Sequence, residues 1–240
     1  MRIGLISDVH ANVLALEAVM AELRRADVDT VLCLGDVVGY GPAPNETIEL
    51  LRSANVMCTL GDADERIAYG FARRAKRAGV ADQTLEWTQG VLDPQHLQWL
   101  RELPVQRRLE TPAGRLRAFH GSAEDPSERT NLQQDPVALT RLLQRHRASL
   151  LCSGGSHVPY FRQVGSAGWV INPGSVGLSL NGEPGADYAL IEISDAAASV
   201  TMDKVDYDIA AVAFDIVAWG LPAVIAEALQ RGRMPSSDER

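Results

Sequence analysis

Cysteine is scarce in this sequence of 240 residues, and no two cysteines are closely spaced. The three thiols, Cys33, Cys58 and Cys152, each lie inside an apolar run. A disulfide framework needs an even set of cysteines and a zinc ribbon needs close pairs, so the spacing argues against both. The sequence predicts three free core thiols in a reducing compartment, which we expect to be the cytoplasm.

Long hydrophobic runs are also lacking. The first apolar run ends at Asp8, which is too early for the core of a signal peptide. The apolar stretch over residues 210–229 is interrupted by Asp215, Gly220 and Pro222. It predicts a pair of packed helices rather than a membrane span, so we expect no membrane partner.

Positive charge is in deficit: 23 lysines and arginines face 31 aspartates and glutamates, which gives a net charge of -8. Neutralising a phosphate backbone needs the opposite balance, so the composition argues against a nucleic-acid partner. Carboxylates gathered at one site would instead hold cations. Hydrophobic residues make up 46% of the chain, enough for one large core, and we expect a single domain over residues 1–240.

The first part of the chain alternates short apolar runs with amphipathic segments. We expect strands at 2–7, 30–34 and 56–60, and helices at 12–25 and 46–53. This alternation is typical of right-handed βαβ units in a parallel sheet.

The rest of the chain contains a long helical segment followed by a part that is rich in strands. Residues 63–103 read as helical, with Asp93 as a helix N-cap before Pro94. Further strands are expected at 115–120, 150–153, 169–172, 188–193 and 199–203, with a helix at 136–147 and the last two strands in a hairpin. Helices at 208–219 and 222–230, within residues 206–232, are expected to cover an outer face, and residues 233–240 form a frayed tail. Two face-to-face sheets with helices outside are therefore predicted.

Polar side chains follow six of the apolar runs. The fragments are Ser7-Asp8-Val9-His10, Gly35-Asp36-Val37-Val38-Gly39, Gly61-Asp62-Ala63-Asp64, His120-Gly121-Ser122, Gly154-Gly155-Ser156-His157 and Asn172-Pro173-Gly174-Ser175. Ligands bind beyond the carboxyl ends of strands in α/β sheets, so these fragments are expected to form one site. Phosphate-ester hydrolysis at a two-metal centre uses this mixture of carboxylates and imidazoles.

Each fragment has a metal-binding interpretation and a plainer, structural one. Asp8 and His10 can reach one ion from an extended segment, and the carboxylate of Asp36 can bridge two ions about 3.5–4 Å apart. Asp62 or Asp64 could instead cap the helix that follows. A lone histidine at a strand end is more often structural, and the histidines on charged helices, His96 and His146, are expected on solvated faces. The joint pattern, rather than any single match, carries the interpretation.

The pattern resembles the calcineurin-like metallophosphoesterases, and more closely their small bacterial YfcE-type branch of phosphodiesterases and phosphatases. The resemblance runs from residue 1 to about residue 232. The stretches that carry it are Ser7 to Asn12, Leu34 to Pro42, Ile171 to Gly177 and Gly220-Leu221-Pro222. It implies an α/β fold of the metallo-dependent phosphatase type, a four-layer α/β/β/α sandwich.

The resemblance also implies a ligand set and a substrate class. Asp8, His10, Asp36 and His157 would hold a first ion, and Asp36 would bridge to a second ion held also by Asp62 and His120. In the family an activated water or hydroxide between the ions attacks phosphorus in line. One or two divalent ions per chain are expected, Mn²⁺ first and Mg²⁺, Zn²⁺, Fe or Ni as alternatives, with a small phosphorylated or nucleotide-like substrate. Relatives often pair, so a homo-oligomer is compatible with the resemblance. We predict catalytic roles for Asp36, Asp62 and Asp64.

Three positions depart from the family pattern. Gly155 stands where the second ion expects an imidazole, Asp62 replaces an asparagine, and Ala63 replaces a histidine that assists the leaving group. The added carboxylate favours oxygen-preferring ions such as Mn²⁺ or Mg²⁺. General acid assistance is typically worth ~10²–10⁴-fold, so its loss should slow alkoxide leaving groups far more than nitrophenoxide or a phosphate anion.

Three hypotheses follow. The first is a metal-dependent phosphoesterase with a remodelled second metal site. The second is a degenerate, non-catalytic module that binds a metal or a nucleotide and acts in regulation. The third, a purely structural α/β protein whose acids are helix caps, fits six ordered motifs poorly. The sequence contains no recognisable motif that identifies the substrate. Four arginines are candidate phosphate contacts only because they lie near the motifs in the sequence: Arg66, Arg73, Arg74 and Arg162.

Overall fold

The computed structural model describes residues 1–70, 79–128, 135–194 and 197–235. The strands are β1 (Arg2–Ile6), β2 (Thr30–Cys33), β3 (Met57–Cys58), β4 (Gln106–Thr111), β5 (Gly114–Phe119), β6 (Leu150–Ser153), β7 (Tyr160–Val164), β8 (Gly168–Asn172), β9 (Ala186–Ser194) and β10 (Ala197–Val205). The helices are α1 (Val13–Arg25), α2 (Pro44–Ser53), α3 (Asp62–Tyr69), α4 (Val80–Val91), α5 (Pro94–Glu102), α6 (Pro136–His146), α7 (Ile209–Ala218) and α8 (Ala223–Arg231).

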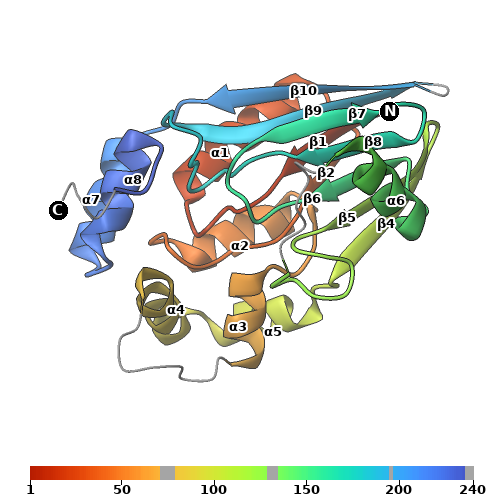
Figure 1. Cartoon of the computed structure of the whole chain (residues 1–240). Helices are drawn as coiled ribbons and strands as arrows, with labels where there is room; N and C mark the ends of the chain where they lie inside the picture. Colours follow the sequence, from red (N-terminus) through yellow and green to blue (C-terminus); the bar gives the residue numbers. More distant parts are fainter. Residues whose placement is uncertain (71–78, 129–134, 195–196, 236–240) are drawn as a thin grey trace.

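The described strands form two five-stranded sheets (Figure 1). One has the order β10-β9-β1-β2-β3 and the other the order β4-β5-β6-β8-β7. β1, β2 and β3 run parallel, as do β5, β6 and β8, so their carboxyl ends meet at one end of the molecule. The two antiparallel additions to the first sheet come from the expected β9–β10 hairpin.

The side-chain alternation of β1 explains the layers. Ile3 and Leu5 belong to the core shared with the second sheet, whereas Ile6 belongs to the core beneath α1. Successive residues of a strand face opposite sides, so both faces of β1 are buried. Gly4 lies on the helix side, where a Cβ atom would lie 2.8 Å from the Leu23 side chain. The glycine therefore lets α1 pack close to the sheet.

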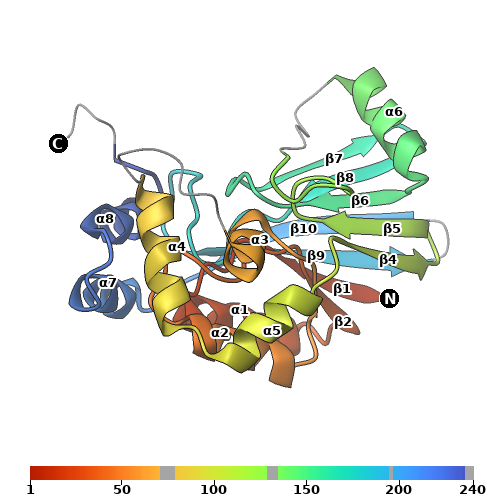
Figure 2. The same ribbon diagram turned by 90° about the horizontal axis from the view of Figure 1, so that it is seen from below.

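Helices cover the outer face of each sheet. Figure 2 shows α1 and α2 outside the sheet that contains β1, and α6 outside the sheet that contains β5. Leu139 and Leu143 of α6 pack with Leu151 and Val170 of the second sheet. The order helix, sheet, sheet, helix is the four-layer α/β/β/α sandwich, so the expected fold class is confirmed.

Two strands, β4 and β7, were not expected from the sequence. Both are edge strands of the second sheet, and their sequences, QRRLET and YFRQV, contain charged or polar residues rather than an apolar run. Edge strands commonly carry such residues because one side of the strand stays open to solvent. A search for buried apolar runs therefore missed them.

The C-terminal helices lie at an end of the sandwich rather than over the face of a sheet. Their buried residues pack with the start of α1, with α4 and with the loop after β8, through contacts that include Leu14, Trp87 and Leu178. Figure 1 shows α7 and α8 beside the strand ends. The expected helix pair is present, but its position on an outer face is wrong. The expected frayed tail is described only as far as residue 235.

The prediction for the two helical histidines is also wrong, because both are buried. The exposed fraction is 0% for His96 and 8% for His146. Nδ1 of His96 lies 2.8 Å from Oδ1 of Asn45, and the His146 ring packs 5.4 Å from the ring of Phe119. Charged residues near each histidine in the sequence suggested a solvated helix, so the sequence did not show that the histidine lies on the buried side of its helix. Within the described residues, no helix is long and apolar enough to cross a membrane.

Candidate metal centre

The loops after four parallel strands bring the predicted ligands together. Asp8 follows β1, Asp36 follows β2, His120 follows β5 and His157 follows β6. Two close contacts set the spacing: a Cβ atom on Gly61 would clash with the Asp36 backbone nitrogen, and one on Gly35 would lie 2.6 Å from the Gly61 nitrogen. Glycine at both positions therefore lets the loops after β2 and β3 touch.

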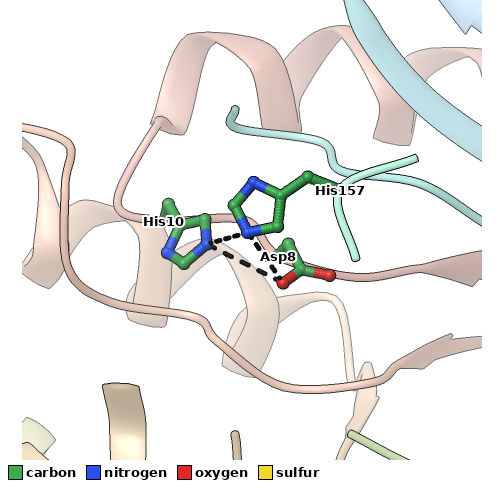
Figure 3. A group of neighbouring side chains, drawn as sticks. All are labelled: Asp8, His10 and His157. Carbon is green, nitrogen blue, oxygen red and sulfur yellow. Dashed lines mark hydrogen bonds and ion pairs between the residues drawn. The ribbon is translucent and has the colours of Figure 1, made fainter. Parts of the chain in front are cut away.

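The first group of side chains consists of Asp8, His10 and His157 (Figure 3). Nε2 of His10 lies 3.0 Å from Nε2 of His157. Oδ1 of Asp8 lies 3.2 Å from the His157 Nε2 and 3.8 Å from the His10 Nε2. Atoms that coordinate one ion at about 2.0–2.2 Å are separated by about 3–3.5 Å, so this group is close to the spacing of a shared ion.

The second group consists of Asp8, Asp36 and His120. Oδ2 of Asp36 lies 3.5 Å from Nε2 of His120 and 3.8 Å from Nε2 of His10. Asp36 therefore reaches a histidine from each group, which suits a carboxylate shared between two ions. Its other oxygen, Oδ1, accepts a hydrogen bond from the Ala63 backbone N–H at 2.8 Å.

Backbone carbonyls fix the orientation of all three histidine rings. Nδ1 of His10 lies 3.2 Å from the Val38 carbonyl oxygen, and Nδ1 of His120 lies 3.0 Å from that of Leu34. Nδ1 of His157 lies 2.8 Å from the Leu178 carbonyl oxygen. A carbonyl only accepts, so each Nδ1 carries a proton and each ring turns its Nε2 toward the centre, where the lone pair of the neutral form is available to an ion.

Burial and neighbouring charge control protonation in the centre. Burial lowers the pKa of His10 to about 3, and the nearby His157 acts in the same direction. Burial raises the pKa of Asp36 to about 7, while His120 acts in the opposite direction. Burial disfavours charge on His120, but Asp36 and Asp8 raise its pKa overall. His10, which does not take up a proton, thus lies beside two carboxylates, Asp8 and Asp36, that favour an added positive charge.

The donors fit a bound divalent cation. Asp8 is fully buried, and its Oδ1 has no hydrogen-bond partner. In the neutral, Nδ1-protonated forms of the two rings, the facing Nε2 atoms of His10 and His157 are both acceptors, so positive charge, carried by a bound cation or by a proton, stabilises their 3.0 Å separation. Metal ions bind neutral imidazoles and ionised carboxylates, which is the donor set of these residues.

Four of the predicted ligand residues have a left-handed backbone. The φ angles are 53° for Asp8, 48° for His10, 52° for Asp36 and 58° for His157. Residues other than glycine rarely adopt this conformation, and such outliers gather at functional sites. The backbone of the site is therefore held by its surroundings and aims the side chains inward.

The fragment Gly61-Asp62-Ala63-Asp64 forms the first turn of α3. Asp64 is fully buried, and it accepts hydrogen bonds from the backbone N–H groups of Val37, Val38 and Gly61. It thereby ties the loop after β2 to the start of α3. Asp62 is half-buried on the cleft wall. It belongs to neither ligand group among the described residues, so the structure does not bring it together with the other predicted ligands.

Gly155 contributes a backbone group in place of an imidazole. Its N–H donates to Oδ2 of Asp8 at 3.1 Å, and its φ is 79°. A Cβ atom there would lie 3.3 Å from Nε2 of His120. A side chain at this position would be strained and would crowd His120, so the glycine suits the observed path of the loop.

A cleft of about 150 Å³ opens onto the centre. Asp36, His120 and His157 line it, together with residues that include Tyr40, Ala81, Leu85, Pro126, Ser127 and Glu128. Arg66 also lines the cleft and forms an ion pair with Asp82 of α4. Of the other candidate arginines, Arg162 is exposed on β7, and Arg73 and Arg74 lie outside the described residues.

Loading with a divalent ion is expected to raise thermal stability strongly. An ion present at 100–1,000 times its dissociation constant adds ~2.7–4.1 kcal/mol to the free energy of unfolding. For a chain of this length, each 1 kcal/mol raises Tm by ~2–4 °C. We therefore expect the melting temperature to fall by ~5–16 °C in chelator and to recover with Mn²⁺, measured by differential scanning fluorimetry. An equal shift in His10→Ala would contradict binding at this centre.

Comparisons with known proteins point to one family. A family model described as the calcineurin-like phosphoesterase superfamily domain matches residues 1–196. The chain is 32% identical to a metallophosphoesterase from Sphaerobacter thermophilus; the crystal structure of that protein superimposes with a TM-score of 0.79, covering 97% of this chain and 99% of that chain.

Two further relatives extend this picture. The protein MJ0912 of Methanocaldococcus jannaschii, described as uncharacterised, is 29% identical over 251 residues, which cover 96% of this chain and 98% of the relative. The phosphoesterase YfcE from E. coli is 21% identical, with a TM-score of 0.51 over 86% of this chain and 100% of YfcE. At that identity the likeness to YfcE concerns the fold alone.

Proposed function

Because this chain belongs to the calcineurin-like phosphoesterase superfamily and is a hydrolase of phosphoric esters, we propose that it is a phosphodiesterase with a dinuclear centre and a remodelled second metal site. The family expected from the sequence is confirmed, and the likeness to YfcE extends to the fold. The proposal adds the number of ions, the preference for Mn²⁺ and the kind of ester.

The orientation of the histidines is the observation that carries the proposal. Three buried or nearly buried imidazoles, of His10, His120 and His157, turn their Nε2 atoms toward Asp8 and Asp36. A structural polar cluster would pair donors with acceptors, whereas this cluster gathers acceptors. With neutral rings, such a gathering is stabilised by bound cations; in metal-free protein a proton on His157, whose pKa is lowered by burial but raised overall by Asp8, would have the same effect.

The second site would be poorer in nitrogen ligands than the first. Asp8, His10 and His157 would hold one ion, and Asp36 with His120 would hold the other. We assign Asp62 to this second ion by its position on the cleft wall. A site rich in carboxylate oxygen favours Mn²⁺ or Mg²⁺ over softer ions.

The side chains of the cleft have separate roles in the reaction. Bound ions would supply positive charge to the phosphoryl oxygens and lower the pKa of a water molecule. Arg66, held by Asp82, adds a fixed positive charge to the cleft wall. Ala63 and Leu85 make the wall apolar beside His10, where a Cβ atom on Gly39 would meet both side chains. No proton donor stands at position 63, so esters with good leaving groups are preferred.

Asp64 acts through the backbone in this proposal. Both of its oxygens are engaged by backbone N–H groups, so we assign it as a positioning residue for Asp36 rather than as a group that contacts the substrate. Asp36 is the catalytic member of the predicted trio because it lies between the two ligand groups.

A second function, a binding module without turnover, is favoured by one observation. Gly155 and Ala63 offer neither a ligand nor an acid at positions that line the cleft. A protein that holds one ion and binds a nucleotide or phosphate without hydrolysis would tolerate both residues.

Metal content and turnover, measured on the same sample, decide between the two functions. We expect two ions per chain after mild purification with Mn²⁺, together with hydrolysis of bis-p-nitrophenyl phosphate that depends on the ion. One ion or none, with no hydrolysis in excess Mn²⁺, would favour the binding module. One ion with full activity would contradict the dinuclear centre but keep the phosphodiesterase.

A further inference from the structure

The segment after β8 braces the metal centre through its backbone. The Ser175 hydroxyl donates to the Asp8 carbonyl oxygen at 2.7 Å, and the Gly177 N–H donates to the same oxygen at 3.0 Å. Further along, the Leu178 carbonyl accepts from Nδ1 of His157, and the Leu180 N–H donates to the His157 carbonyl oxygen at 3.1 Å. His157 is therefore held through both its ring and its backbone by residues two apart.

The residues that alternate with these turn to another partner, Lys204 of β10. Its ammonium group lies 3.0 Å from the Ser179 hydroxyl, 3.3 Å from Oδ1 of Asn181 and 2.8 Å from the Glu183 carbonyl oxygen. Leu178 and Leu180 of residues 178–183 thus contact His157, and Ser179, Asn181 and Glu183 contact Lys204.

The buried carboxylate of Asp187 binds both Lys204 and this segment. Oδ1 of Asp187 lies 2.9 Å from Nζ of Lys204 and accepts from Asn181 at 3.3 Å. The exposed fraction of Asp187 is 2%, and its Oδ2 has no hydrogen-bond partner. A buried carboxylate that loses its counter-charge is strongly destabilised, so Asp187 strongly favours the observed position of Lys204.

The use of lysine at this position is itself informative. The sequence contains two lysines, Lys76 and Lys204, among 23 basic residues. An ammonium group is a compact charge with three donors, whereas a guanidinium is a planar fork. The acceptors around Lys204 converge on one point, and a Cβ atom on Gly185 would lie 2.9 Å from its side chain. The enclosure suits the compact ion.

We propose that Lys204 is a positioning residue for the metal centre, acting through residues 178–183 to hold the imidazole of His157 in its ligand orientation. Lys204 touches none of the ligands. Its effect passes through the Leu178 carbonyl, which is the partner that selects the Nδ1–H tautomer of His157. The proposal rests on the proposed metal-dependent function only in assuming that His157 binds an ion.

The test is Lys204→Met, which keeps most of the side-chain stem and removes the charge. Metal-free protein is titrated with Mn²⁺ by calorimetry, well below the melting temperature. Loss of a partner bonded directly to a ligand typically weakens metal binding by ~10–100-fold. Lys204 acts one contact further away, so we expect the lower end of that range at the ion assigned to His157 by comparison with His157→Ala. Hydrogen exchange of the Leu180 amide should also become faster. Arg25→Met, which removes an exposed cation paired with Glu22, is the matched control and should change neither.

Folded Lys204→Met protein that binds Mn²⁺ within twofold of the parent, or that keeps the Leu180 amide equally protected, would overturn the proposal. If Lys204→Met does not fold, Asp187→Asn takes its place; it should weaken Mn²⁺ binding less but measurably, and unchanged affinity would again overturn the proposal. Loss of Mn²⁺ affinity in these variants, with no hydrolysis by the parent, would leave this inference standing while the phosphodiesterase proposal fails.

Discussion

Asp36→Asn is expected to lower the turnover of bis-p-nitrophenyl phosphate by at least ~10²–10³-fold, the loss that removal of one charge-stabilising group commonly causes. An amide is nearly the same size as the carboxylate, so the fold should persist. It is neutral, however, and cannot serve two cations with ionised oxygens. The same variant should lose one of two bound ions, measured by elemental analysis beside steady-state kinetics.

Asp27→Asn provides a closely matched control for this variant. Asp27 is exposed at the end of α1, and its φ of 50° is close to the 52° of Asp36. Asparagine tolerates this conformation, so the same chemical change occurs in the same backbone geometry but away from the site. Control turnover should match the parent. Asp36→Asn protein that keeps two ions and parental turnover would show that Asp36 is not the shared ligand.

Ala63→His is expected to increase hydrolysis of alkyl phosphate esters by ~10²-fold or more while changing nitrophenyl esters little, because a general acid contributes ~10²–10⁴-fold where the leaving group needs a proton. Ala63 is nearly buried on the cleft wall, directly after Asp62 in the first turn of α3. The measurement is the ratio of kcat/KM for a methyl p-nitrophenyl diester and a dialkyl diester.

A second variant, Ala63→Phe, separates acid assistance from a change in cleft shape, because phenylalanine adds volume without adding a proton donor. Ala63→Phe should alter KM for both esters without favouring the alkyl ester. An equal gain for both esters in Ala63→His would mean that the missing histidine is not an acid in this protein. Gly155→His should give no such gain, because the φ of 79° and the nearby His120 oppose a side chain there.

The side chains of the two candidate ligand groups could be grouped from the sequence because each one follows directly from a local pattern. Asp8, Asp36 and His120 end apolar runs, and parallel strands bring their carboxyl ends to one edge. The alternation of strand and helix predicted the sheets for the same reason. Local patterns therefore sufficed where one strand and its adjoining loop carry the information.

Features that depend on distant partners could not be read in this way. The carbonyl of Leu178 orients His157 across 21 residues, and the carbonyl of Leu34 orients His120 across 86 residues. A carbonyl leaves no trace in the sequence because every residue has one. Burial of His96 likewise depends on Asn45, which lies 51 residues away and is not marked by any pattern.

The left-handed backbone at the ligand positions restricts how this site can change over evolution. Among residues other than glycine, aspartate, asparagine and histidine are the ones enriched in that conformation, whereas β-branched residues are strongly disfavoured. The backbone adopts it at Asp8, His10, Asp36 and His157. The amino acids that are tolerated at each of these positions are therefore mostly metal ligands and glycine. Drift at these positions tends either to exchange one donor for another or to delete it. A combinatorial library restricted to aspartate, asparagine, histidine and glycine would sample most of the metal sites that this backbone can form.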